Sequence, residues 1–180
     1  ISSTGTYMRF DHDALVGILA LEAERAGAVV VGEDLGTFEA WVQDVLAAKG
    51  VMGTSILWFE GSPTVEGPRL QEEYRELALS SVTTHDLPPT AGFLAGEHIT
   101  LREELGLFTR DAALEDADDL EWQAEVLNRV REAGCFDGTE LAETDFEGLA
   151  RDERGDVHTL MEGIHRFIAG APSALSCISL

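Results

Sequence analysis

Positive charge is scarce in this chain of 180 residues. It has 34 acidic residues against 12 basic ones, which gives a formal net charge of −22, and Lys49 is its one lysine. Proteins that bind nucleic acids or anionic membranes need basic patches to attract phosphate groups. The composition therefore argues against a nucleic acid or a membrane as partner and suits a neutral ligand better.

Cysteines and long apolar runs are also lacking. Cys135 and Cys177 are the only cysteines, and their separation fits no disulfide framework. No apolar run is long enough to span a bilayer. The acidic cluster at residues 115–119 lacks the glycine and ligand spacing of a calcium loop, so we interpret it as a solvated helix face. We expect no metal site and no other cofactor.

A pair of carboxylates follows a short β-prone run in the first third of the chain. Residues 27–36 read GAVVVGEDLG, and a β-branched run bounded by glycines is typical of an inner strand of a parallel sheet. Helix signals follow over residues 37–50. Active sites of α/β folds lie on loops at the carboxyl ends of such strands. We therefore expect Glu33 and Asp34 at the functional edge, although one of them could equally cap a helix or bind the loop backbone.

Two further β-prone stretches end in polar residues. Residues 55–60 read SILWFE, and residues 81–89 read SVTTHDLPP. If these stretches are strands of the same parallel sheet, Glu60, His85 and Asp86 extend from the edge that carries Glu33. Such a cluster could perform general acid/base catalysis on a glycosidic bond, bind a divalent metal, or serve only as helix caps.

Three motifs in this order resemble the amylomaltases, or 4-α-glucanotransferases: GEDLG at 32–36, LWFE at 57–60 and THDLP at 84–88. The likeness extends through GTY at 5–7, ILALE at 18–22 and HRF at 165–167, so it covers most of the chain. The resemblance implies a (β/α)₈ barrel that cleaves an α-1,4-glucan. It also implies a covalent glycosyl-enzyme, whose sugar passes to the 4-hydroxyl of another glucan, and a cytoplasmic location.

The resemblance assigns a role to each motif residue. Glu33 resembles the general acid/base, Asp86 the carboxylate that stabilises the transition state, and His85 a neighbour that hydrogen-bonds the same sugar ring. These roles also have independent physical reasons, because a leaving oxygen needs a proton and a carboxylate binds a flattening sugar ring more tightly. The expected substrate-binding residues around them are Asp34, Glu60 and Trp58.

One short segment imitates the family's nucleophile motif, which reads arginine, apolar residue, aspartate, histidine. Residues 9–12 read RFDH. We interpret Asp11 instead as the cap of a helix that ends at Gly27, because the flanking residues match the stretch that follows the nucleophile strand in the family. The apolar face of this helix would consist of Leu15, Ile18, Leu19 and Ala26. On this interpretation the nucleophile lies upstream of Ile1.

The chain is shorter than the roughly 250 residues of a full barrel. We interpret residues 1–180 as the C-terminal half of the glucanotransferase barrel, with its last four strands, truncated at both ends. A helical insertion of about 92–156 should precede the last strand, expected at 174–180, and Asp156 should cap the helix before that strand. A half-barrel exposes unpaired strands and an apolar interior, so copies of the chain are expected to self-associate.

Hypotheses from different functional classes remain. The first is glycosyl transfer between α-1,4-glucans by a retaining mechanism, with the acid/base and the transition-state carboxylate on this chain and the nucleophile elsewhere. The alternative is a catalytically silent fragment that binds glucan or takes part in assembly. A metal-dependent hydrolase built on Glu33, His85 and Asp86 is disfavoured, because the chain lacks histidine-rich ligand spacing.

Overall fold

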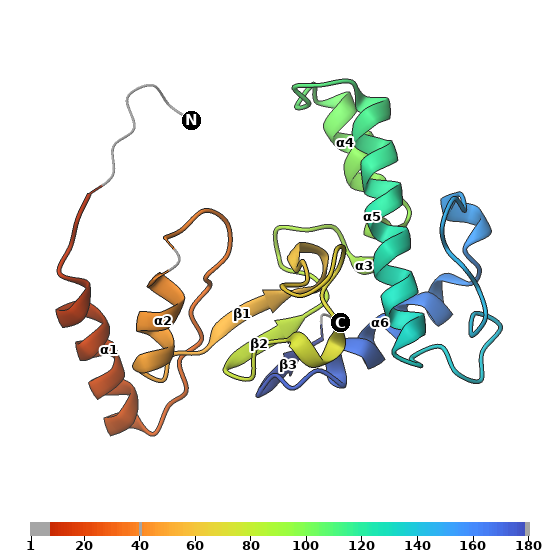
Figure 1. Cartoon of the computed structure of the whole chain (residues 1–180). Coiled ribbons are helices and arrows are strands. Elements are labelled where there is room, and N and C mark those ends of the chain that lie inside the picture. Colours follow the sequence, from red (N-terminus) through yellow and green to blue (C-terminus); the bar gives the residue numbers. More distant parts are fainter. Residues whose placement is uncertain (1–7, 40, 179–180) are drawn as a thin grey trace. The chain divides into compact units, whose positions relative to one another are not determined.

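The computed structural model describes residues 8–39 and 41–178 (Figure 1). Helices and a small parallel sheet give an α/β fold, as the sequence predicts. The chain divides into two compact units, with the boundary between Thr54 and Ser55.

The first unit contains helices α1 (His12–Ala26) and α2 (Trp41–Ala48). Asp11 caps α1, because its Oδ1 accepts a hydrogen bond from the Ala14 N–H at 3.1 Å. Gly27 ends the helix in the left-handed conformation, with φ of 62°. The predicted capping role of Asp11 is confirmed.

The expected apolar face of α1 is not buried. Leu15, Ile18 and Leu19 are 58%, 60% and 45% exposed. The structure describes every residue of α1, and none of them is buried. The helix is therefore defined by its caps and its local hydrogen bonds more than by packing.

The β-branched run at residues 29–31 forms a single parallel bridge, between Val31 and Met52, and the prediction of a buried strand there is wrong. Pairing is nevertheless parallel: the Gly32 N–H donates to the Met52 carbonyl at 2.7 Å, and the Met52 N–H donates to the Val30 carbonyl at 3.0 Å. The side chains of Val29 and Val31 remain exposed because so short a contact covers neither of them. The helix expected from residue 37 is α2, which begins only at Trp41.

The sheet has three strands in the order β1 (Gly53–Ile56), β2 (Ala78–Ser81) and β3 (Leu175–Cys177). Strands β2 and β3 are parallel, with Leu79 opposite Leu175. Both strands expected to carry site residues end earlier than predicted. The first changes into a 3₁₀ turn at Leu57–Phe59, and β2 ends at Ser81, so His85 and Asp86 lie in the loop that follows it.

Four helices of the second unit surround its core, and α4 and α6 both pack beside the long α5 (Figure 1). Asp111 caps α5, and Asp156 caps α6 as the sequence predicts. No helix in the described parts of the chain has both the length and the apolar character required to cross a membrane. The helices are α3 (Thr90–Leu94), α4 (Glu97–Glu104), α5 (Ala112–Glu132) and α6 (Val157–Ala169), and single 3₁₀ turns lie at Gln71–Glu73 and Arg151–Glu153.

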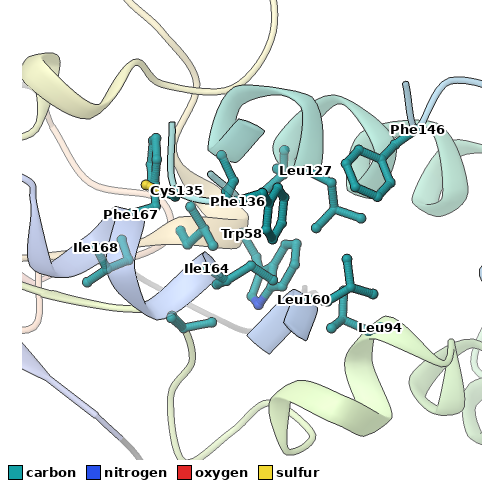
Figure 2. Packing of buried hydrophobic residues seen from close by; sticks show 14 of the residues in the cluster. Trp58, Leu94, Leu127, Cys135, Phe136, Phe146, Leu160, Ile164, Phe167 and Ile168 are labelled. Carbon is teal, nitrogen blue, oxygen red and sulfur yellow. The ribbon is translucent and has the colours of Figure 1, made fainter. Parts of the chain in front are cut away.

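The core of the second unit lies where the apolar faces of α5 and α6 meet the loop after α5 (Figure 2). Leu127 on α5 and Ile164 on α6 are fully buried, as are Phe136 and Phe146 from the connection between these helices. Gly163 allows this packing, since a Cβ added there would lie 2.1 Å from Phe136 Cε1. The apolar spacing of residues 157–168 predicts a buried stripe on α6, and four of its members are buried: Leu160, Ile164, Phe167 and Ile168. Met161 is partly buried and Val157, at the start of the helix, is 37% exposed.

One member of the acidic cluster on α5 points inward. Asp119 was expected on the solvated face, but only 12% of its side chain is exposed. Its carboxylate binds His98 Nε2 at 2.9 Å and Arg151 Nη2 at 2.7 Å, and it accepts a hydrogen bond from Gln123 Nε2 at 2.8 Å. These partners explain how a carboxylate can be buried, because its charge is both paired and hydrogen-bonded.

Candidate functional site

The loop after β2 presents His85 and Asp86 to solvent. Their side chains are 78% and 77% exposed, and His85 Nε2 lies 3.3 Å from Asp86 Oδ1. Thr84 holds the turn, since its hydroxyl accepts a hydrogen bond from the Asp86 N–H at 3.2 Å and its carbonyl accepts one from the Leu87 N–H at 3.2 Å. The two side chains are thus presented as a pair on a hydrogen-bonded turn.

A cleft of about 600 Å³ adjoins this pair. One part of its lining comes from the loop and the other from α4 and the residues that follow this helix. The lining residues are His85, Asp86, Leu87, Pro88, Glu97, His98, Leu101, Arg102 and Leu107. A cavity of this size is in the range that binds drug-sized ligands, about 300–1,000 Å³.

Helix α4 is anchored at this cleft through His98. Its ring stacks on Phe93 of α3, with a centroid distance of 4.2 Å and an interplanar angle of 2°. Its Nε2 binds Asp119 of α5, which also binds Arg151. The contacts of one histidine therefore connect the α4 side of the cleft to two other helices.

Glu60 is largely covered and carries an ion pair. Its Oε2 lies 3.0 Å from Arg69 Nη2, and 14% of the Glu60 side chain is exposed. The Arg69 N–H donates to the Glu60 carbonyl at 3.0 Å, and Arg69 Nε donates to the Gly61 carbonyl at 3.2 Å. Burial, together with the Glu60 charge, raises the pKa of the Tyr74 phenol well above its ordinary value. Glu60 thus stabilises the base of the loop at residues 61–68.

Polar contacts also hold this loop, which the sequence suggests is flexible. Ser62 Oγ donates to Glu73 Oε2 at 2.7 Å, the Thr64 hydroxyl donates to Glu73 Oε1, and the Leu70 N–H donates to Glu73 Oε2 at 3.1 Å. The Thr64 hydrogen bond is the largest of the effects that lower the pKa of the Glu73 carboxyl. Glu73, which the sequence analysis does not single out, is therefore the residue that ties the loop together.

Trp58 belongs to the core. The residue is 4% exposed and lies within the buried cluster (Figure 2). Its ring stacks on that of Phe93, with centroids 4.6 Å apart. Its carbonyl accepts a hydrogen bond from Trp122 Nε1 at 3.0 Å. Among the described residues, Trp58 Nε1 has no hydrogen-bond partner. The ring is not available as an exposed sugar platform in this conformation.

In the first unit, the two carboxylates of the GEDLG segment differ. Asp34 binds the loop: its Oδ1 accepts from the Thr54 N–H at 2.7 Å, and its Oδ2 accepts from Gln43 Nε2 at 2.9 Å. Glu33 is exposed. The alternative that one of the pair binds the loop backbone thus applies to Asp34. The Glu33 side chain is the one that is exposed to solvent. Glu33 and Asp86 belong to different units, so their convergence stays a prediction.

Sequence reasoning missed the α4 residues of the cleft. Glu97 and Arg102 lie on α4, and Leu107 follows this helix, in a region that the sequence describes only as a helical insertion. The scarcity of basic residues could have drawn attention to Arg102, which lies on the second helix after the THDLP motif. Within residues 8–39 and 41–178, no three His, Cys, Asp or Glu side chains are grouped so that they could hold a metal ion.

Comparisons with known proteins agree over nearly the whole chain. The family model described as 4-alpha-glucanotransferase matches residues 2–180. A Mycobacterium tuberculosis protein named 4-alpha-glucanotransferase is 48% identical, over 98% of this chain and 23% of that protein. A Haemophilus influenzae protein of the same name is 28% identical, over 65% of this chain and 16% of that protein.

A solved structure is also similar. The crystal structure of amylomaltase from Corynebacterium glutamicum matches with a TM-score of 0.91 and 63% sequence identity, over 99% of this chain and 25% of that one. The chain thus spans about a quarter of the length of the relatives it matches most fully.

Proposed function

This chain belongs to the 4-alpha-glucanotransferase family, and on that premise we propose that it takes part in glycosyl transfer between α-1,4-glucans by a retaining mechanism. The observation that carries the proposal is the exposed His85–Asp86 pair beside a cleft of about 600 Å³, in a motif that resembles the family's. The net charge of −22 suits a neutral polymer as ligand. We propose glucan as the partner and, from the family resemblance, the cytoplasm as the location.

In this proposal Glu33 is the general acid/base. Its carboxyl protonates the glycosidic oxygen as the bond to the leaving sugar breaks, and its carboxylate then takes the proton of the acceptor 4-hydroxyl as the new bond forms. Exposure of Glu33 in the first unit leaves it free for this role, whereas Asp34 is engaged with Thr54 and Gln43. Asp11 caps α1, so the proposal assigns the nucleophile to no residue of this chain.

Asp86 and His85 bind the ring that carries the developing positive charge. A carboxylate near the sugar hydroxyls binds more strongly as the ring flattens toward an oxocarbenium ion, which lowers the barrier more than it improves ground-state binding. The substrate-binding roles of Asp34, Glu60 and Trp58 stay predictions. Their contacts to Thr54, Arg69 and Phe93 fit residues that support the site's loops and core.

The architecture that we propose is the second half of a (β/α)₈ barrel, with its last four strands. Strand β3 is the last of them, and residues of about 92–156 form the helical insertion before it. Two observations support this arrangement: the parallel pairing of β2 with β3 and the similarity to the Corynebacterium glutamicum amylomaltase structure. Candidate site residues then follow the carboxyl ends of barrel strands, where active sites of such barrels lie.

The test uses the protein expressed from its complete reading frame. Glu33→Gln should reduce transfer from maltotriose about 10²–10⁴-fold while glucan binding is preserved, because the amide keeps the size of the side chain but loses its proton. Asp86→Asn should lower kcat more than it raises KM. The control is Glu39→Gln, which changes another exposed glutamate of the first unit. Chromatography of the oligosaccharide products measures transfer, and an active Glu33→Gln enzyme would refute the assignment.

The alternative, a silent glucan-binding fragment, is tested with the 180-residue chain alone. We expect this chain to bind malto-oligosaccharides but to show no disproportionation of maltotriose. If glucose and longer oligomers formed, and their formation ceased in Asp11→Asn, Asp11 would have to be reassigned as the nucleophile despite its contact with Ala14.

A further inference from the structure

Arg102 is the arginine of α4 that lines the cleft beside His85 and Asp86. Its guanidinium carbon lies 5.1 Å from the centroid of the Phe108 ring, a distance that gives a cation–π contact. Among the described residues, no carboxylate lies within ion-pairing distance of Arg102, although the chain has 34 acidic residues. Arg102 acts on the Glu115 carboxylate only at longer range, as one of the charges that lower the pKa of that carboxyl. The Arg102 guanidinium is therefore placed by an aromatic face and not by an ion pair, so its N–H donors can reach a ligand.

The surface around Arg102 is amphipathic. Leu101 and Leu107, which line the same cleft, are 55% and 57% exposed. A glucose unit presents hydroxyls at its edge and an apolar face of C–H groups, so a surface that combines free N–H donors with exposed leucines matches it. The cleft volume of about 600 Å³ also exceeds what a single ring beside Asp86 would need.

This surface is built on a fixed support. The ring of His98, one turn before Arg102, binds Asp119 and stacks on Phe93. Gly96 precedes α4 with φ of 77°, and a Cβ added there would lie 2.8 Å from the guanidinium of Arg151, which also binds Asp119. The N-terminal end of α4 is thereby held against α5, which fixes the backbone that carries Arg102.

We propose that Arg102, together with Leu101 and Leu107, binds the glucose unit of an α-1,4-glucan that adjoins the ring bound by Asp86 and His85. The inference rests on the proposed function, since it takes glucan as the ligand of this cleft. Arg102 donates hydrogen bonds to sugar hydroxyls, and the leucines cover the apolar face of the ring. The residue serves ground-state binding, so its loss should affect KM and not kcat.

The experiment measures maltoheptaose binding by calorimetry, and KM and kcat for transfer, in the protein from its complete reading frame. Arg102→Gln should weaken binding and raise KM roughly tenfold, as expected for a charge-assisted hydrogen bond, while kcat stays within about twofold. Arg102→Lys keeps the charge but not the planar donors, so its affinity and its KM should lie between those of the parent and those of Arg102→Gln. The control Arg166→Gln removes an arginine that is 52% exposed and lies on α6; it should change neither quantity.

Each other outcome counts against the inference. If Arg102→Gln binds maltoheptaose as tightly as the parent, or if kcat falls together with affinity, Arg102 does not bind substrate. Thermal unfolding of each variant separates this result from misfolding. Phe108→Leu removes the aromatic support but keeps Arg102, so it should raise KM by less than Arg102→Gln does. Failure of the proposed function is seen separately: the parent would bind no glucan, or Glu33→Gln would retain transfer.

Discussion

The two units of this chain differ in how they use apolar residues. The second unit gathers them into one buried cluster that extends from Leu57 to Ile168. In the first unit, α1 and α2 bury none of their residues, all of which the structure describes. The candidate acid/base Glu33 therefore comes from a unit ordered mainly by local contacts, whereas His85 and Asp86 lie on a loop attached to a packed core. Both carboxylates are exposed, but the loop that carries Asp86 is attached to a packed core and the segment that carries Glu33 is not.

Substitution of one leucine in each unit should give the largest effect of this difference in packing. Leu127 on α5 is fully buried and Leu15 on α1 is 58% exposed. In the 180-residue chain, Leu127→Ala should cost about 2–5 kcal/mol of unfolding free energy because it leaves a cavity. Leu15→Ala should change it by no more than about 0.5 kcal/mol. Urea unfolding followed by tryptophan fluorescence measures both, and similar losses for the two variants would contradict the contrast between the units.

Two helical glycines, one in each unit, test the same difference in packing. A Cβ at Gly163 in α6 would lie 2.1 Å from the buried Phe136 ring, whereas nothing lies within 4 Å of a Cβ at Gly17 in α1. Gly163→Ala should destabilise the second unit by about 1–3 kcal/mol, because overpacking outweighs the gain in helix propensity. Gly17→Ala should stabilise α1 by up to about 1 kcal/mol.

Hydrogen exchange measured separately for α1 and α6 gives the sign of each change. Slower exchange in α6 of Gly163→Ala would show that Phe136 moves aside at little cost. Faster exchange in α1 of Gly17→Ala would show that this helix packs against something in solution.

The helices of the second unit could be predicted because their signals are local. Asp156, an apolar stripe at helical spacing and Gly170 predict α6 within fifteen residues, and the structure reproduces both ends of the helix and all of the stripe except Val157, which is exposed. The burial of Asp119 could not be predicted in this way. Its partners His98 and Arg151 are 21 and 32 residues away in sequence, and periodicity within α5 carries no information about them.

Strand ends were harder to predict than helices. Residues 56–59 are all apolar, so their composition does not show that the strand ends at Ile56 and that a 3₁₀ turn begins at Leu57. The motifs drew attention to residues 84–88, where the structure shows His85 and Asp86 exposed beside a cleft, and the roles of these two residues stay predictions. They could not identify Arg102, because its place in the cleft depends on the packing of α4 against α5.

Helix caps provide the smallest and most specific test. The backbone N–H of Thr159 donates to Asp156 Oδ2 at 2.9 Å, and this hydrogen bond is the main reason that the pKa of the Asp156 carboxyl is lowered. A lowered pKa in the folded state means that the ionised form stabilises α6. This stabilisation is fully present above the ordinary aspartate pKa of about 3.9 and is lost as the pH falls through the lower folded value.

Asp156→Asn should remove that pH dependence, because asparagine also caps helices but does not titrate. Unfolding midpoints in urea are compared between the parent and Asp156→Asn at pH 6 and pH 3. They should differ less at pH 3, because the stabilisation by the ionised cap declines as the pH falls below the ordinary aspartate pKa. An NMR titration of the Asp156 carboxyl gives its pKa directly. A value at or above the ordinary one would show that the Thr159 contact does not persist in solution. Asp11→Ala is the comparison in α1: because no core supports that helix, loss of its cap should appear as local fraying, with no shift in the midpoint reported by Trp58 and Trp122.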